Sequence, residues 1–141
     1  MLLISFHGGD TGINNVQCYD TTTNALLSDN ALALPTTGSL AELRAIIVAN
    51  RQLYVASGAK STSQVLCYSL PNANGECIFI SEIIGPTLSN KKQHFETAIS
   101  HPFGIAFSEE NTCYISNQDT NVVAQVIVAN NVGSLGKGSQ S

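Results

Sequence analysis

The sequence repeats one pattern of short apolar segments three times, and this repeat limits the possible folds more than any other feature. In each unit an apolar segment leads through a polar turn to a second apolar segment. The first segments are residues 2–6, 53–57 and 113–117, and the second segments are residues 16–20, 65–69 and 122–128. Short segments rich in β-branched and aromatic residues between polar turns are typical of strands, and two in succession predict a hairpin.

Further apolar segments extend the second and third units. Residues 44–49 precede the second hairpin, and residues 103–107 precede the third. After the second hairpin, the turn-forming residues 71–75 (PNANG) lead to another apolar segment at 77–84. The middle unit is therefore predicted to hold four antiparallel strands in succession.

These units predict the fold class. Four-stranded antiparallel units that recur at intervals of roughly 40–50 residues are typical of the blades of a β-propeller. One such unit cannot bury both of its faces alone, and the continuous apolar run Ile46, Ile47 and Val48 fits a strand covered on both faces. A β-sandwich is the structural alternative, because short strands with turns suit it as well, but it requires no repeat. We expect an all-β, incomplete β-propeller of about two to three four-stranded antiparallel blades.

The repeat also predicts how the chain is divided. A partial first blade covers residues 1–43, a full second blade 44–100 and a partial third blade 101–132, and a flexible Gly/Ser tail covers 133–141. The first blade lacks its innermost strand and the third lacks its outermost one. Because a propeller needs at least about four blades to close, we expect a piece of a longer protein. The alternative is a second copy of the chain that completes a ring of about six blades.

Composition excludes several classes of partner. Only 11% of the residues are charged, the net charge is -4, and the basic residues are scattered, so no nucleic-acid partner is expected. No apolar run approaches the roughly 20 residues of a membrane helix, so no membrane partner is expected. None of the 4 cysteines forms a C-x-x-C pair, and we expect buried free thiols in preference to disulfides.

Parts of the chain resemble known propeller repeats. Residues 102–107 (PFGIAF) with 114–117 (YISN) resemble the P-x-G-I-A-F…Y-V-A-D pattern of NHL-type repeats. Residues 114–123 resemble the beginning of the YVTN repeat, and residues 16–24 resemble its V-x-V-I-D-T-x-T-N end. The resemblance implies a propeller repeat protein, and it favours a non-catalytic binding or interaction scaffold.

The third unit is also similar to gluconolactonase-like propellers. That family has P-N-G before this strand, with the Asn as a metal ligand, and an Asp after the Y-V-S segment. Here Phe103 and Asn117 stand at the matching positions, and Phe103 cannot bind a metal. The alternative function implied by these resemblances is part of a lactonase-like hydrolase or of an NHL-type lyase, in which histidines around the channel hold zinc.

The candidate binding residues are His101, Phe103 and Asn117, which we expect to face the central channel and to contact an unidentified protein or small-molecule ligand. No catalytic residue, metal site or cofactor is predicted. Zinc needs three or four ligands, and the place in the middle unit that matches His101 holds Leu43 and Arg44.

Three further residues belong to turns. His7 opens an H-G-G segment similar to the oxyanion loop of lipases, but the chain has no G-x-S-x-G motif, so a hairpin connection is expected. Asn14 and Asp119 lie in turn segments that could offer oxygen atoms to calcium. Because Asn and Asp at hairpin turns more often bond their own backbone, turn capping is favoured.

Overall fold

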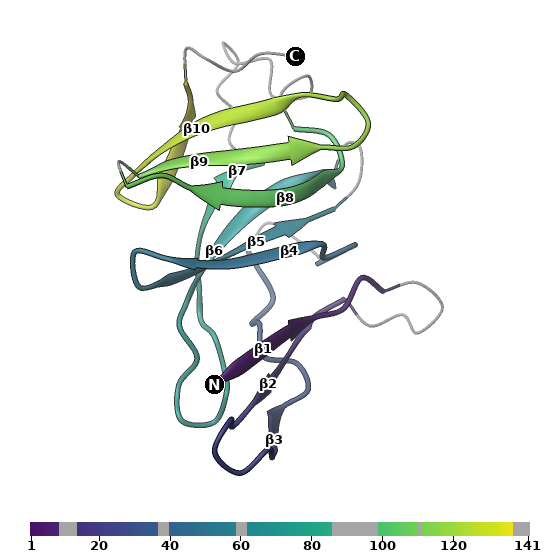
Figure 1. Cartoon of the computed structure of the whole chain (residues 1–141), viewed down its shortest axis with the longest axis vertical. Coiled ribbons are helices and arrows are strands. Elements are labelled where there is room, and N and C mark those ends of the chain that lie inside the picture. Colours follow the sequence, from purple (N-terminus) through teal and green to yellow (C-terminus); the bar gives the residue numbers. More distant parts are fainter. Residues whose placement is uncertain (9–13, 37–39, 59–61, 86–98, 110, 137–141) are drawn as a thin grey trace.

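The protein is described by a computed structural model that covers residues 1–8, 14–36, 40–58, 62–85, 99–109 and 111–136. The described residues form an all-β structure of three antiparallel sheets without an α-helix (Figure 1). The first sheet contains β1 (Leu2–Ser5), β2 (Val16–Tyr19) and β3 (Leu26–Ser28). The middle sheet contains β4 (Ala45–Ala49), β5 (Gln52–Ser57), β6 (Gln64–Ser69) and β7 (Phe79–Ile84). The third sheet contains β8 (Pro102–Phe107), β9 (Thr112–Asn117), β10 (Val123–Ala129) and β11 (Val132–Leu135).

The sheets follow one another along the chain and lie one above the other. Strands that are consecutive in the sequence are neighbours in every sheet, so each sheet is a simple meander. Figure 1 shows the first sheet at the bottom, the middle sheet above it and the third sheet at the top. The described part of the chain holds no helix of the length and apolarity that crossing a bilayer requires.

The hairpin registers of the first and middle sheets match, and that of the third sheet differs from them by one residue. Leu2 pairs with Tyr19 between β1 and β2, and Leu53 pairs with Tyr68 between β5 and β6. In the third sheet Cys113 pairs with Val126 between β9 and β10. The segments that begin at Leu2, Leu53 and Cys113 each form a hairpin with the strand that follows, and those at Leu53 and Cys113 are the second strands of their sheets.

Two hydrophobic clusters hold the sheets together, and the middle sheet contributes to both. The lower core lies between the first and middle sheets and contains Val16, Cys18, Ala31, Leu32, Leu40, Leu43, Leu53, Val55, Leu66, Tyr68 and Cys77. The upper core lies between the middle and third sheets and contains Tyr54, Val65, Cys67, Ile83, Ile84, Ile99, Cys113, Ile115, Ala124, Val126 and Val128. Since successive side chains of a strand point to opposite faces, β5 and β6 alternate between the two cores.

The strands covered on both faces are β5 and β6 rather than β4. In β4, Ile46 packs against the lower core and Ile47 against the upper core, but Val48 is 56% exposed. As the edge strand of the middle sheet, β4 has less neighbouring structure above and below it. Of the apolar run Ile46, Ile47 and Val48, only the first two residues therefore pack against the neighbouring sheets.

The third sheet is complete, which corrects the expected end of the chain. The sequence predicted no outermost strand and a flexible tail from Gly133, but Val132–Leu135 forms β11 and pairs with β10. The connection is a two-residue turn in which Asn130 and Asn131 both have positive φ, 51° and 61°. Asparagine tolerates this conformation, and such turns suit the twist of a hairpin. Gly133 also fits tightly, because a side chain there would collide with the Ile83 carbonyl of β7.

The four cysteines are buried and free, as the sequence predicted. Cys18 and Cys77 lie in the lower core, and Cys67 and Cys113 lie in the upper core. They pack as small apolar side chains.

Candidate functional site

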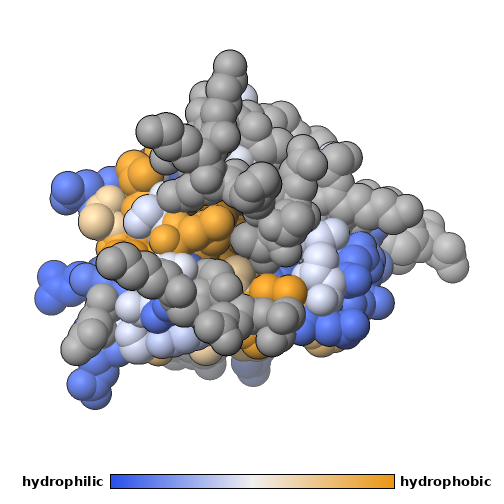
Figure 2. Space-filling view, turned by 90° about the horizontal axis from the view of Figure 1, so that it is seen from above, coloured by the Kyte–Doolittle hydropathy of each residue, from blue (hydrophilic) through white to orange (hydrophobic). Residues whose placement is uncertain are grey.

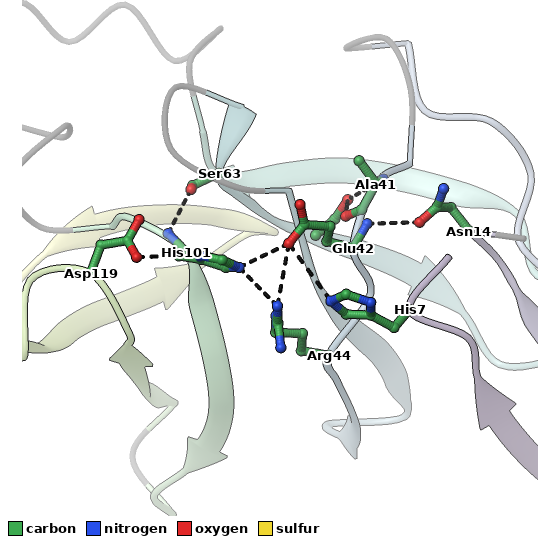
Figure 3. Close-up of polar contacts among 9 residues, drawn as sticks. His7, Asn14, Ala41, Glu42, Arg44, Ser63, His101 and Asp119 are labelled. Carbon is green, nitrogen blue, oxygen red and sulfur yellow. Dashed lines mark hydrogen bonds and ion pairs between the residues drawn. The ribbon is translucent and has the colours of Figure 1, made fainter. Parts of the chain in front are cut away.

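A cluster of polar side chains lies along one side of the stack, where loops at the ends of strands from all three sheets meet (Figure 3). His7 follows β1, Glu42 precedes β4, and His101 precedes β8. Asp119 lies in the turn between β9 and β10. Residues far apart in the sequence are therefore brought to one place by the stacking of the sheets.

The carboxylate of Glu42 is the centre of this cluster. Its Oε2 atom lies 2.8 Å from Nε2 of His101, 3.3 Å from Nη2 of Arg44 and 3.7 Å from Nε2 of His7. Burial raises the pKa of Glu42, but the hydrogen bonds from His101 and Arg44 outweigh it and hold this pKa below its usual value. The side chain of Glu42 is 37% exposed, so solvent and salt weaken these ion pairs.

His101 joins carboxylates of two sheets. Its Nδ1 atom lies 3.3 Å from Oδ1 of Asp119, and its Nε2 atom lies close to Glu42 and 3.0 Å from Nη2 of Arg44. A guanidinium can only donate hydrogen bonds. The Nε2 atom donates to Glu42 in one tautomer and accepts from Arg44 in the other, so this atom bonds only one of the two side chains at a time.

Glu42 and His101 occupy corresponding positions in consecutive sheets. Both have the left-handed backbone conformation that non-glycine residues seldom adopt, with φ of 46° and 57°. The amide of Glu42 donates to Oδ1 of Asn14 at 2.8 Å, and the amide of His101 donates to Oγ of Ser63 at 2.9 Å. Asn14 and Ser63 each stand two residues before the matching valines, Val16 and Val65. One backbone contact between neighbouring sheets is thus made twice.

A shallow hollow of about 360 Å³ lies beside this cluster. It is lined by Ser5, His7, Leu43, Arg44 and Phe103. The guanidinium carbon of Arg44 lies 5.4 Å from the centre of the Phe103 ring, which is a cation–π distance. The Nε atom of Arg44 is buried and has no hydrogen-bond partner among the described residues. The hollow therefore combines the exposed ring of Phe103 with the guanidinium group of Arg44.

The three residues predicted from the sequence have different surroundings. His101 belongs to the polar cluster, and Phe103 lines the hollow and is 54% exposed. Asn117 is buried, and its side-chain amide donates to the carbonyls of Ile115 and Val122 while its Oδ1 accepts from the amide of Ser100. The structure therefore assigns Asn117 to the support of its loop and not to the hollow.

A matching contact in the middle sheet has the same role. The hydroxyl of Ser57 is 3.1 Å from both the amide and the carbonyl of Ala41. Ser57 and Asn117 each end the second strand of a four-stranded sheet. Both side chains therefore hold the chain segment that enters the first strand of their own sheet.

The sequence did not single out Glu42, and it misplaced the counterpart of His101. Ile46 pairs with Val55, and Ile105 pairs with Ile115. Glu42 stands four residues before Ile46, and His101 stands four residues before Ile105, so the two residues are equivalent in their sheets. Leu43 and Arg44 were expected at this position of the middle sheet. Aligning β4 with β8, and extending that alignment into the loops that precede them, would have identified Glu42 as the equivalent of His101.

Asp119 and His7 were treated as turn residues, and the structure gives them ionic partners as well. Asp119 faces His101, and His7 faces Glu42. The parts of the chain that the structure describes contain no group of three or more His, Cys, Asp or Glu side chains placed to hold a metal ion.

Comparison with protein-family models, with curated proteins and with solved structures finds no match to this chain.

Proposed function

We propose that the three sheets are consecutive blades of a β-propeller of the NHL/YVTN kind and that they act as a non-catalytic binding scaffold. The observation that carries the proposal is the repeated contact between sheets, in which Glu42 bonds to Asn14 as His101 bonds to Ser63. A repeated contact of this kind is expected where one unit is stacked on the next with the same geometry. The matching hairpin registers of the first and middle sheets support the same conclusion.

The covered middle sheet favours blades over a sandwich. In a two-sheet sandwich each sheet packs on one face only and leaves its other face to solvent. Here β5 places Leu53 in the lower core and Tyr54 in the upper core, so a sheet lies on each side of it. Stacked blades require this arrangement.

The hollow beside Arg44 is the proposed ligand site. The exposed ring of Phe103 offers apolar surface, and the guanidinium group of Arg44 offers positive charge. The class of ligand that fits is a small planar group with a carbonyl or carboxylate oxygen, which can stack on Phe103 and accept from Arg44. The site is continuous with the polar cluster, because Nη2 of Arg44 also lies 3.3 Å from Glu42 and 3.0 Å from His101.

Binding of simple probes tests this function. We expect benzoate and benzamide to change the NMR signals of Arg44 and Phe103 in the ¹⁵N-labelled chain. Phe103→Ala should weaken binding roughly fivefold, because a partly exposed stacking contact is worth about 1 kcal/mol. Ile78→Ala is the matched control, since Ile78 is 67% exposed and lies outside the hollow.

Two results contradict the proposal. One is the absence of NMR changes around the hollow, or a binding affinity that is the same for the Phe103→Ala and Ile78→Ala variants. The other is hydrolysis of a simple lactone that requires an added divalent metal, because it would indicate the lactonase-like function.

A further inference from the structure

The two outermost faces of the stack carry exposed apolar side chains. On the third sheet, the face directed away from the upper core exposes Tyr114 by 40%, Val123 by 50% and Ile127 by 46%. On the first sheet, Leu2 and Ile4 of β1 are exposed by 49% and 40%. Seen from above, hydrophobic surface lies between polar regions at the rim (Figure 2).

The exposed face of the third sheet corresponds to a face that the middle sheet buries. Tyr54 follows Leu53 in β5, and Tyr114 follows Cys113 in β9. Leu53 and Cys113 each face the preceding sheet, so the two tyrosines face the opposite way. Tyr114 therefore takes the place of Tyr54, which lies in the upper core with its ring 4.5 Å from that of Phe107. In the middle sheet this face receives the next sheet.

The exposed face of the first sheet corresponds to the opposite face of the middle sheet. Leu2 and Ile4 take the places of Leu53 and Val55, as their pairing with β2 shows. Leu53 and Val55 lie in the lower core, where they receive the preceding sheet. One end of the stack thus presents a face that packs onto a following sheet, and the other end presents a face that accepts one.

We propose that a second copy of this chain covers these faces, with the third sheet of each copy packed on the first sheet of the other. The occupant follows from the two internal interfaces, in which the corresponding faces are covered by sheets of this same chain. None of the five exposed side chains is charged, so no like-charge repulsion opposes the contact. Two such head-to-tail contacts close a ring of two chains. This proposal and the proposed function both rest on the equivalence of the sheets, but the contact between copies involves none of the residues of the hollow.

The contact between copies is expected to be weaker than the internal ones. The first sheet has three strands among the described residues, so it offers Tyr114 no counterpart of Phe107 on β8. The internal contacts also include the amide bonds of Glu42 and His101, which precede the first strand of a four-stranded sheet. The first sheet, with three described strands, offers no such residue to a second copy. The assembly should therefore rely on apolar packing and depend on protein concentration.

Analytical ultracentrifugation of the 141-residue chain over a range of concentrations tests the inference. The expected species at high concentration has twice the 14.9 kDa mass of one chain. Val123→Glu and Ile4→Glu should each weaken association about tenfold or more, because each would bury an unpaired carboxylate. Val48→Glu is the control, since Val48 is equally exposed but lies on β4, outside both faces.

Mixing the two variants distinguishes this mode from a symmetric contact of like faces. The intact third sheet of Ile4→Glu can pack on the intact first sheet of Val123→Glu, so the mixture should associate better than either variant alone. Unchanged far-UV circular dichroism, and thermal midpoints equal to that of the unaltered chain at a concentration where all are monomeric, show that the variants are folded. A chain that stays monomeric, a larger open assembly, or a mixture that associates no better than its components overturns the inference.

Discussion

The two buried tyrosines of the middle sheet differ in the surroundings of their hydroxyl groups. Tyr54 and Tyr68 are both about fully buried, at 1% and 0% exposure. The hydroxyl of Tyr54 donates to Oε1 of Gln52 at 3.0 Å, whereas that of Tyr68 is buried with no hydrogen-bond partner among the described residues. Burial raises the pKa of Tyr54 to about 12, and burial raises the pKa of Tyr68 as well. Neither group is therefore ionised near neutral pH.

This difference predicts opposite effects for the same substitution. An unpaired buried hydroxyl costs about 1–3 kcal/mol, so Tyr68→Phe should raise the free energy of unfolding by about 1 kcal/mol once a small void is allowed for. The ring contact of Tyr68 with Phe79, at 5.6 Å between centres, is kept. Tyr54→Phe loses a hydrogen bond and should lower the free energy of unfolding by about 1 kcal/mol. The thermal midpoints should move roughly 3 °C in opposite directions.

Urea unfolding followed by far-UV circular dichroism measures both values. The two variants should show the same dependence of the free energy on urea concentration, so the midpoints report stability alone. If Tyr68→Phe loses as much stability as Tyr54→Phe, the hydroxyl of Tyr68 has a bonding partner in solution, and the reasoning from its isolation is refuted.

Three further predictions concern the cluster, the cysteines and the third sheet. Because the pKa of Glu42 is lowered in the folded chain, its carboxylate stabilises the fold above its usual pKa of 4.5, and this contribution is lost as the pH falls below that value. Glu42→Gln should thus cost up to about 1 kcal/mol in urea unfolding at pH 7 and less as the pH falls through the lowered pKa of Glu42; an equal cost at neutral and acidic pH would contradict the role of its charge. Burial raises the pKa of Cys113 to about 12 and that of Cys77 to about 11. Both thiols should therefore react with a disulfide reagent only after denaturant is added, and rapid labelling of the native chain would contradict their burial. Gly133→Ala should lower stability by about 1–3 kcal/mol in thermal unfolding, because a Cβ atom collides with β7, whereas Ser134→Ala on the exposed face should be neutral. Equal effects would contradict the close approach of β11 to β7.

The strands were largely predictable because their signals are local. The segments at Leu2, Leu53 and Cys113 combine apolar residues with polar turns, and each forms a strand in the structure. Residues 132–135 (VGSL) were not recognised, because Gly and Ser have low strand propensity. Their strand is fixed by the Asn130–Asn131 turn and by the close approach of Gly133 to β7, and only the turn has a local signature.

The site was only partly predictable because it depends on how the sheets stack. His101 and Phe103 were identified from their place before and within a strand, but Glu42 lies 59 residues away from His101. Nothing in either local sequence indicates that the two side chains meet. The position of Asn117 at the end of its strand predicted a channel-facing binding residue, while its burial follows from the tertiary fold.

The contacts that hold the sheets together also form the hollow. Ser5 comes from the first sheet, Arg44 from the start of the middle sheet and Phe103 from the third sheet. The backbone strain at Glu42 and His101 is offset by the bonds of their amides to the preceding sheet, so the loops keep this conformation only while the sheets are stacked. Because Arg44 and Phe103 lie two residues beyond these anchored positions, their cation–π contact depends on the same stacking. A ligand that binds both side chains would therefore stabilise the contact between the middle and third sheets, and loss of either amide bond would weaken ligand binding without touching the hollow itself.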